Sequence, residues 1–106
     1  MDKLAEVFKQ HNYVLTNETT KGLELENKRT GEVIYLLPNV ETTIVLNPKT
    51  VEGNEELKEK VTGLSHSTAL KQFPKRKHTG KDPIHYGYSL KFQSPEELGS
   101  FLAYLN

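Results

Sequence analysis

The apolar residues of the C-terminal part of the chain change their spacing, and this change constrains the fold more than any other feature. From Ile84 to Phe92, apolar residues alternate with polar or small ones, as in a strand with one buried face. After Ser94 the spacing becomes that of a helix with one apolar stripe. The stripe consists of Leu98, Phe101, Leu102 and Leu105. The sequence therefore predicts a strand followed by a helix, each with one face in a core.

The start of this last helix is marked by three residues. Ser94 is the expected N-cap, and Pro95 suits the first helical position because proline lacks the N–H that a helix start leaves unpaired. Glu97 stands three residues after Ser94, which is the spacing of a capping box.

The rest of the chain predicts two more helices and four more strands. The helices are expected from Asp2 to about His11, and from Asn54 through Leu57, Val61 and Leu64. The strands are expected at residues 13–15, 22–26, 32–37 and 42–46. The stretch 65–73 fits either a short helix or an extended segment.

Short turns between consecutive strands favour antiparallel pairing, and helices separated from the strands favour an α+β domain. We expect an antiparallel four- or five-stranded sheet with the N- and C-terminal helices packed on one face. Residues 1–106 are expected to form one compact domain, with a mobile basic loop at about 74–83.

The composition excludes several classes of site. The chain has 106 residues and no cysteine, so disulfides, cysteine-bound zinc, iron–sulfur clusters and thiol catalysis are ruled out. No apolar run approaches the roughly 20 residues that a membrane-spanning helix needs, and the N-terminus lacks the apolar core of a signal peptide. We expect a cytoplasmic protein without a membrane association. Nothing in the sequence indicates an oligomeric state.

Charge is unevenly distributed along a chain whose formal net charge is zero. Residues 1–60 contain eleven of the fourteen acids, whereas residues 71–81 contain five Lys or Arg, one His and no acid. Such a basic segment predicts a contact with phosphates or another polyanion. The alternative is a solvated surface loop without a binding role.

Basic residues in the segment and on the outward face of the following strand form the candidate site for nucleic acid or another polyanion. These residues are Lys75, Arg76, Lys77, His78, Lys81, His85 and Lys91. Tyr86 or Tyr88 would stack on a base if exposed, but both share the apolar face of the strand and are favoured as core or core-edge residues.

Catalysis has weaker support. The spacing of His11, His66, His78 and His85 is not that of a zinc site, so no metal or cofactor is expected. Ser65 and Ser67 flank His66, but neighbouring residues rarely point at each other, and a capping turn is favoured over a catalytic pair.

The sequence thus leaves three hypotheses. The first is a non-enzymatic module that binds nucleic acid or another polyanion. The second is a protein-interaction module, such as an inhibitor, an immunity-type protein or an accessory subunit, that presents its acidic first half to a basic partner. The acids are Glu18, Glu24, Glu26, Glu32, Glu41, Glu52, Glu55, Glu56 and Glu59. The third and least favoured is a hydrolase that uses His66 or His85.

Overall fold

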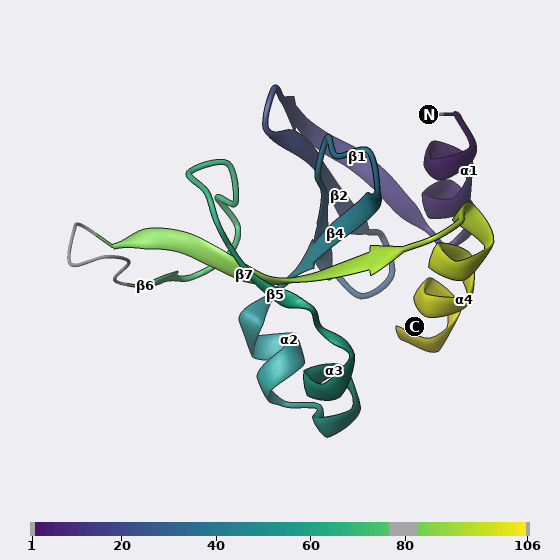
Figure 1. The fold of residues 1–106 in the computed structure, drawn as a ribbon. Coiled ribbons are helices and arrows are strands. Elements are labelled where there is room, and N and C mark those ends of the chain that lie inside the picture. Colours follow the sequence, from purple (N-terminus) through teal and green to yellow (C-terminus); the bar gives the residue numbers. More distant parts are fainter. Residues whose placement is uncertain (1, 77–82, 106) are drawn as a thin grey trace.

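The computed structural model describes residues 2–76 and 83–105 of the chain. The elements in chain order are α1 (Asp2–Gln10), β1 (Tyr13–Thr19), β2 (Gly22–Asn27), β3 (Val33–Leu36), β4 (Thr42–Leu46), α2 (Pro48–Glu52), α3 (Glu55–Lys60), β5 (Gly63–His66), β6 (Lys75–Arg76), β7 (Ile84–Phe92) and α4 (Pro95–Leu105) (Figure 1). The protein is therefore a mixed α+β structure, as the sequence predicts.

All strand pairs are antiparallel, and the order across the sheet is β1-β2-β3-β4-β7-β5. The short strand β6 pairs with the first residues of β7. The sheet thus has more than the expected four or five strands. The excess comes from β5 and β6, whose few residues lack the run of β-branched and aromatic side chains that marks a strand in a sequence.

One face of the sheet carries the main core. Side chains from β2, β3, β4 and β7 meet residues of all four helices there, including Phe8 of α1, Val51 of α2, Leu57 of α3 and Leu102 of α4. The two terminal helices lie side by side at one end of the sheet, and α2 and α3 form a second pair (Figure 1). The sequence does not reveal α2, because Asn47-Pro48 is also typical of the end of a strand. In the structure Asn47 instead caps a short helix with Pro48 at its start.

The opposite face of the sheet is covered in part by residues 67–74, which we call the strap. Leu70 and Phe73 of the strap are buried against Tyr35 of β3 and Val45 of β4. Because Gly87 of β7 has no side chain, Phe73 and Val45 approach its Cα closely. This second small core explains why residues 33–37 are apolar at every position.

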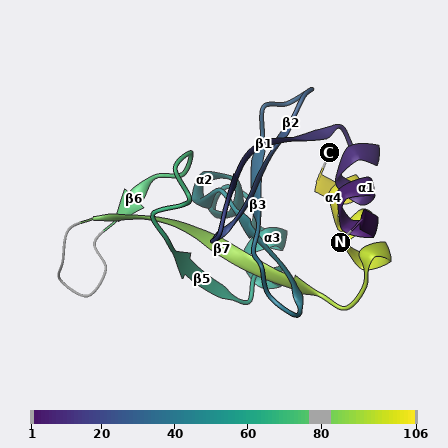
Figure 2. The same ribbon diagram turned by 90° about the horizontal axis from the view of Figure 1, so that it is seen from above.

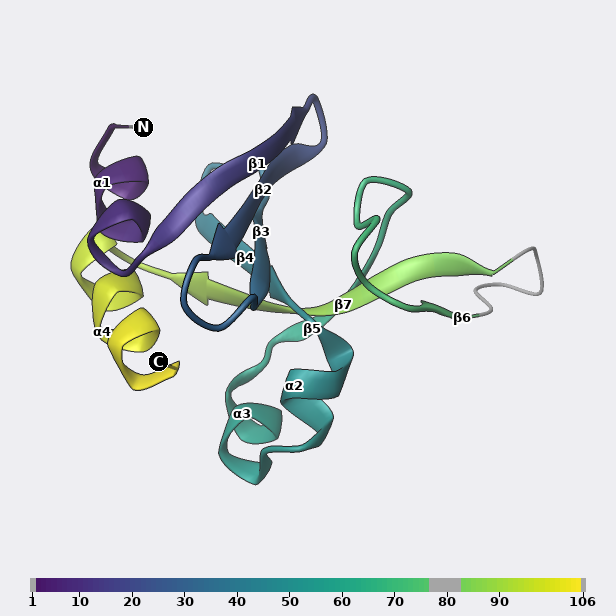
Figure 3. The ribbon, with the colours of Figure 1, turned by 180° about the vertical axis from the view of Figure 1, so that it is seen from behind.

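β7 is the strand on which the candidate site is built. Its second half pairs with β4, whereas its first residues pair with β6 on the same edge and with the end of β5 on the other. We call residues 65–66, 75–76 and 84–87 the ribbon. It projects from the body on the side away from α1 and α4, as Figures 2 and 3 show from two further directions.

Several local expectations are confirmed and others are wrong. Ser94 Oγ accepts the Glu97 N–H, and the Glu97 carboxylate accepts the Gln93 N–H, which together cap α4. Gly31 has a positive φ of 80° and closes the β2–β3 turn. Leu64 lies in β5 and not in a helix, because α3 ends at Lys60.

Part of the expected loop at 74–83 is a strand instead, since residues 75–76 form β6. Residues 77–82 lie outside the described part of the chain. None of the helices in the described part is long and apolar enough to cross a membrane.

Candidate nucleic-acid interface

Lys75 and Arg76 of β6 are exposed and point to opposite faces of the ribbon. Lys75 lies opposite His85 and Arg76 lies opposite Ile84 in the antiparallel pair. Since successive residues of a strand point to opposite sides, the basic residues divide into two groups. Within the described residues, neither Lys75 nor Arg76 has a carboxylate within ion-pair distance. No acid of the described residues thus neutralises either charge.

Three flat side chains lie in a row on the Arg76 face. The guanidinium of Arg76 lies over the ring of Tyr86, with 5.1 Å between its carbon and the ring centroid. On the neighbouring strand, the ring of His66 lies 6.1 Å from that of Tyr86 at an interplanar angle of 24°. Each comes from a different strand, β6, β7 and β5 in turn. We call Arg76, Tyr86 and His66 the stacked row.

The two tyrosines of β7 have different environments. Tyr88 packs against the main core, and its hydroxyl donates a 3.1 Å hydrogen bond to Glu52 of α2. Burial and the nearby Glu52 carboxylate raise the pKa of Tyr88, so its hydroxyl stays protonated near neutral pH. Tyr86 is half-buried and is a member of neither core cluster. The expectation of a core residue therefore holds for Tyr88, whereas Tyr86 lies on the ribbon.

His85 lies on the Lys75 face and has a structural contact. Its Nδ1 lies 2.7 Å from the carbonyl oxygen of Phe73. A carbonyl oxygen only accepts, so Nδ1 carries the proton in this contact. Further along, Tyr86 N–H donates to the Pro74 carbonyl and Ser67 N–H to the His85 carbonyl. These bonds fasten the strap to the ribbon.

The remaining candidate residues are not gathered at the ribbon. Lys91 lies six positions after His85 on β7, which is about 20 Å along an extended strand. It pairs with Glu41 at 3.4 Å instead. Lys77, His78 and Lys81 lie outside the described residues. The structure thus places Lys75 and His85 on one face of the ribbon and Arg76 on the other, and it separates Lys91 from all three.

His66 is a member of the stacked row that sequence reasoning did not assign to the binding site. Its position follows from the pairing of β5 with β7, which places it directly opposite Tyr86. The only sequence signal for this strand is the short alternation of side chains in Gly63-Leu64-Ser65-His66. The spacing of Leu57, Val61 and Leu64 favours a helix over the same region. Only the register of β5 against β7 makes His66 a neighbour of Tyr86.

The arrangement of histidines and serines does not resemble a catalytic pair. His66 and His85 lie on opposite faces of the ribbon, because they are opposite Tyr86 and Lys75 respectively. Ser67 Oγ accepts the Ala69 N–H and caps a turn, as favoured from the sequence, although no helix follows. In the part of the chain that the structure describes, no group of three or more His, Asp or Glu side chains is placed to hold a metal.

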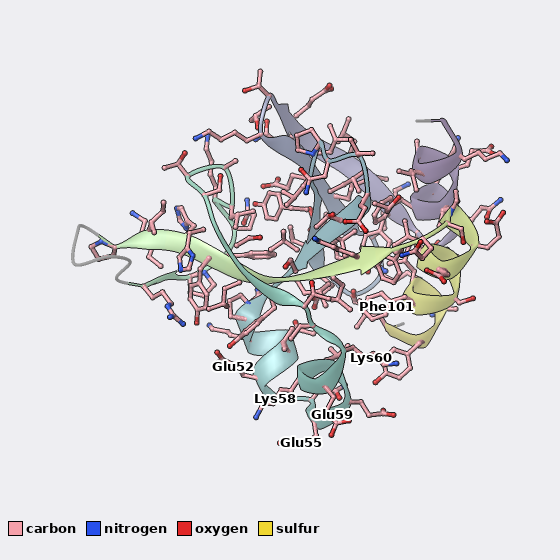
Figure 4. The ribbon with its side chains drawn as sticks, in the orientation of Figure 1. Glu52, Glu55, Lys58, Glu59, Lys60 and Phe101 are labelled. Carbon is pink, nitrogen blue, oxygen red and sulfur yellow. The ribbon has the colours of Figure 1, made fainter. Side chains whose placement is uncertain are left out.

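The acidic residues of the first half do not form one surface. Glu24 is buried under the strap and Glu41 pairs with Lys91. The helical pair α2–α3 carries an exposed group, of which Glu52, Glu55 and Glu59 point outward together with Lys58 (Figure 4). This surface contains bases as well as acids, so its field is weaker than the acid count suggests.

An apolar cavity with a volume of about 310 Å³ lies between α1 and the sheet. Its lining consists of Ala5, Phe8, Lys9, Tyr13, Val14, Leu15, Leu23, Leu25 and Leu36. It has few polar groups that would orient a substrate. The ribbon therefore carries the clearest set of groups with a chemical function. No protein-family model, no curated protein and no solved structure matches this chain.

Proposed function

We propose that this protein is a small non-enzymatic module that binds nucleic acid, or another polyanion, through the ribbon. The observation that carries the proposal is the placement of Lys75 and Arg76. Both are exposed on a strand that extends away from the body, and no carboxylate of the described residues neutralises them. By sequence, the connection from β6 to β7 adds Lys77, His78 and Lys81 to the same basic segment.

The physical basis is counterion release. Phosphates along a nucleic acid hold condensed cations, and a protein side chain that neutralises a phosphate sets those cations free. Arginine suits this role because its planar fork of N–H groups binds two phosphate oxygens at once. Affinity should therefore fall with increasing salt, by about 0.7 to 0.9 in log K per log unit of salt for each phosphate contact.

The test is fluorescence anisotropy at low salt with a labelled mixed-sequence oligonucleotide. We expect binding by the wild type and a large loss in the double variant Lys75→Glu/Arg76→Glu. The matched control is Lys28→Glu/Arg29→Glu, which makes the same charge change in the exposed β2–β3 turn, away from the ribbon. We expect this control to bind almost as well as the wild type.

The salt dependence gives a second measurement. If Lys75 and Arg76 each contact one phosphate, replacing both by Gln should make the slope of log K against log salt shallower by about 1.4 to 1.8. Absence of binding by the wild type, or an equal loss in the ribbon and control variants, would overturn the proposal.

The exposed acids of α2–α3 support a second candidate, a protein-interaction module for a basic partner. Glu52, Glu55, Glu56 and Glu59 are all exposed on this helical pair. Under this hypothesis, Glu55→Lys/Glu59→Lys should abolish capture of the partner from a native lysate, and nuclease treatment should leave wild-type capture intact. We expect a cytoplasmic protein under both candidate functions.

A further inference from the structure

The stacked row gives the ribbon a property that charge alone does not provide. Arg76 is exposed, yet its guanidinium is held over the Tyr86 ring, and His66 supports that ring from the neighbouring strand. A cation over an aromatic ring is attracted by the negative face of the ring. The contact therefore restrains the guanidinium beside the Tyr86 ring, where a free side chain would sample many rotamers.

A guanidinium held in this way offers two binding surfaces. Its edge carries N–H donors for phosphate oxygens, and its outer plane is a stacking surface for a nucleobase. In a duplex both faces of a base are already covered by its neighbours, so only an unpaired base can extend the row.

We infer that the ribbon binds single-stranded nucleic acid, with an unpaired base stacked on the Arg76 guanidinium and Tyr86 as the positioning residue beneath it. This inference rests on the proposed function and names its ligand class. The recognition is tolerant of sequence, because every base has a flat face to stack.

The chain contains a second cation–π pair that serves as a control. Lys60 of α3 lies 5.6 Å from the ring centroid of Tyr104 on α4, and the Tyr104 hydroxyl donates to Glu56 at 2.9 Å. Figure 4 shows Lys60 on the helical side of the molecule, away from the ribbon. Tyr104→Leu therefore removes an equivalent ring without touching the stacked row.

The experiment compares three ligands of equal length by anisotropy at one low salt concentration. They are a mixed-sequence single strand, the same strand annealed to its complement, and a strand built from abasic sites. The abasic strand keeps the phosphates and removes the bases. We expect the base-bearing single strand to bind most tightly.

Two variants test the residues. Tyr86→Leu keeps an apolar side chain but removes the ring, and Arg76→Lys keeps the charge but removes the plane. Each should weaken binding of the base-bearing single strand by about 5- to 150-fold, which is the range for losing one stacked base. Tyr86→Leu leaves the Arg76 charge and N–H groups in place, so it should change abasic-strand binding by about twofold or less. Tyr104→Leu should leave all three affinities unchanged.

The outcomes separate this inference from the proposed function. If the abasic strand binds the wild type as tightly as the base-bearing strand, the stacking inference is wrong and the charge-based function stands. If none of the three ligands binds, the proposed function fails and this inference fails with it. If Tyr86→Leu does not melt cooperatively, the wild-type comparison of the two single strands decides the question alone.

Discussion

The hydroxyl of Tyr35 donates a 2.5 Å hydrogen bond to Oε2 of Glu24, and both side chains are buried. The other carboxylate oxygen of Glu24 accepts from Thr16 Oγ1 at 2.7 Å, and the Tyr35 oxygen accepts the Gln72 N–H at 3.0 Å. The two buried side chains, Glu24 and Tyr35, thus both have hydrogen-bond partners, which polar groups in an interior require. Gln72 belongs to the strap, which leads into β6. The network therefore fastens the strap to the sheet.

Removing the hydroxyl should destabilise the protein. In Tyr35→Phe, Glu24 loses a donor and the Gln72 N–H loses its acceptor, while the ring still fills its space. An unpartnered buried polar group costs about 1–3 kcal/mol. We expect a loss of that size in the free energy of unfolding, measured by urea melts. Tyr104→Phe is the control, since it also removes a tyrosine–glutamate bond, but an exposed one. Equal losses in the two variants would contradict the role given to the network.

Tyr35 should also shape stability at alkaline pH. Burial raises the pKa of Tyr35 well above its ordinary value of about 10, and the bond to Glu24 raises it further. The folded state therefore holds this proton more tightly than the unfolded state. The contribution of this proton to the free energy of unfolding is complete below about pH 10 and is lost as the pH rises towards the folded-state pKa of Tyr35. We expect stability to fall above about pH 10.

The comparison with Tyr35→Phe isolates this effect. Burial raises the pKa of Tyr13 to about 12, so part of the alkaline decline has another source and should remain in the variant. Urea melts at several values between about pH 9 and 11 should show a shallower decline for Tyr35→Phe than for the wild type. Identical slopes would mean that the Tyr35 proton is not held by the fold.

Gly87 should tolerate no side chain. A Cβ at this position would overlap Cγ1 of Val45 and lie 2.8 Å from the Leu46 carbonyl oxygen, with Phe73 at 3.0 Å. Gly87→Ala should therefore force β4 and the strap away from β7, and overpacking of this kind costs about 1–3 kcal/mol. Gly63→Ala on β5 is the matched control, because its Cβ would meet only Ser89 Oγ at an ordinary 3.7 Å. A urea melt that ranks Gly63→Ala as the more destabilised would show that the strap does not lie where the structure places it.

The parts of the fold that could be predicted from the sequence are those with strong local signals. The strand at Ile84–Phe92 and the cap at Ser94 depend on signals within a few residues, and both are confirmed. The expectation of one outward face on this strand is wrong in part, because Gly87 and Ser89 are also buried. β5, β6 and α2 were missed because each has at most five residues and depends on its neighbours for stability. Gly63–His66 becomes a strand because it pairs with the free edge of β7. This pairing is between residues far apart in the sequence, so the local sequence does not show it.

The candidate site was predictable only in part for the same reason. Strand periodicity correctly places His85 and Lys91 on one face of β7 and Tyr86 on the other. It does not reveal that the guanidinium of Arg76 lies over Tyr86. This contact depends on the pairing of Arg76 with Ile84, and these two residues are separated in the sequence by a connecting segment. It also does not show that Lys91 has Glu41 as a partner, because these residues are distant in the sequence.

The C-terminal helix should be essential for folding, and Phe101 tests this. Its ring is 7% exposed and lies 5.5 Å from the ring of Phe92, so it joins α4 to β7. Replacing a core Phe by Ala costs about 3–5 kcal/mol, a large share of the roughly 5–15 kcal/mol that stabilises a small domain. Phe101→Ala should therefore lower the Tm by about ten degrees or more in a thermal melt.

The neighbouring Ser100 provides the control for this helix. It is exposed, so Ser100→Ala changes the same turn of α4 without opening the core, and its Tm should stay within a few degrees of the wild type. Ser94→Ala should fall between the two, because it removes one capping bond worth about 1 kcal/mol. A Tm for Phe101→Ala that matches the Ser100→Ala value would mean that α4 is peripheral and that the main core does not depend on it.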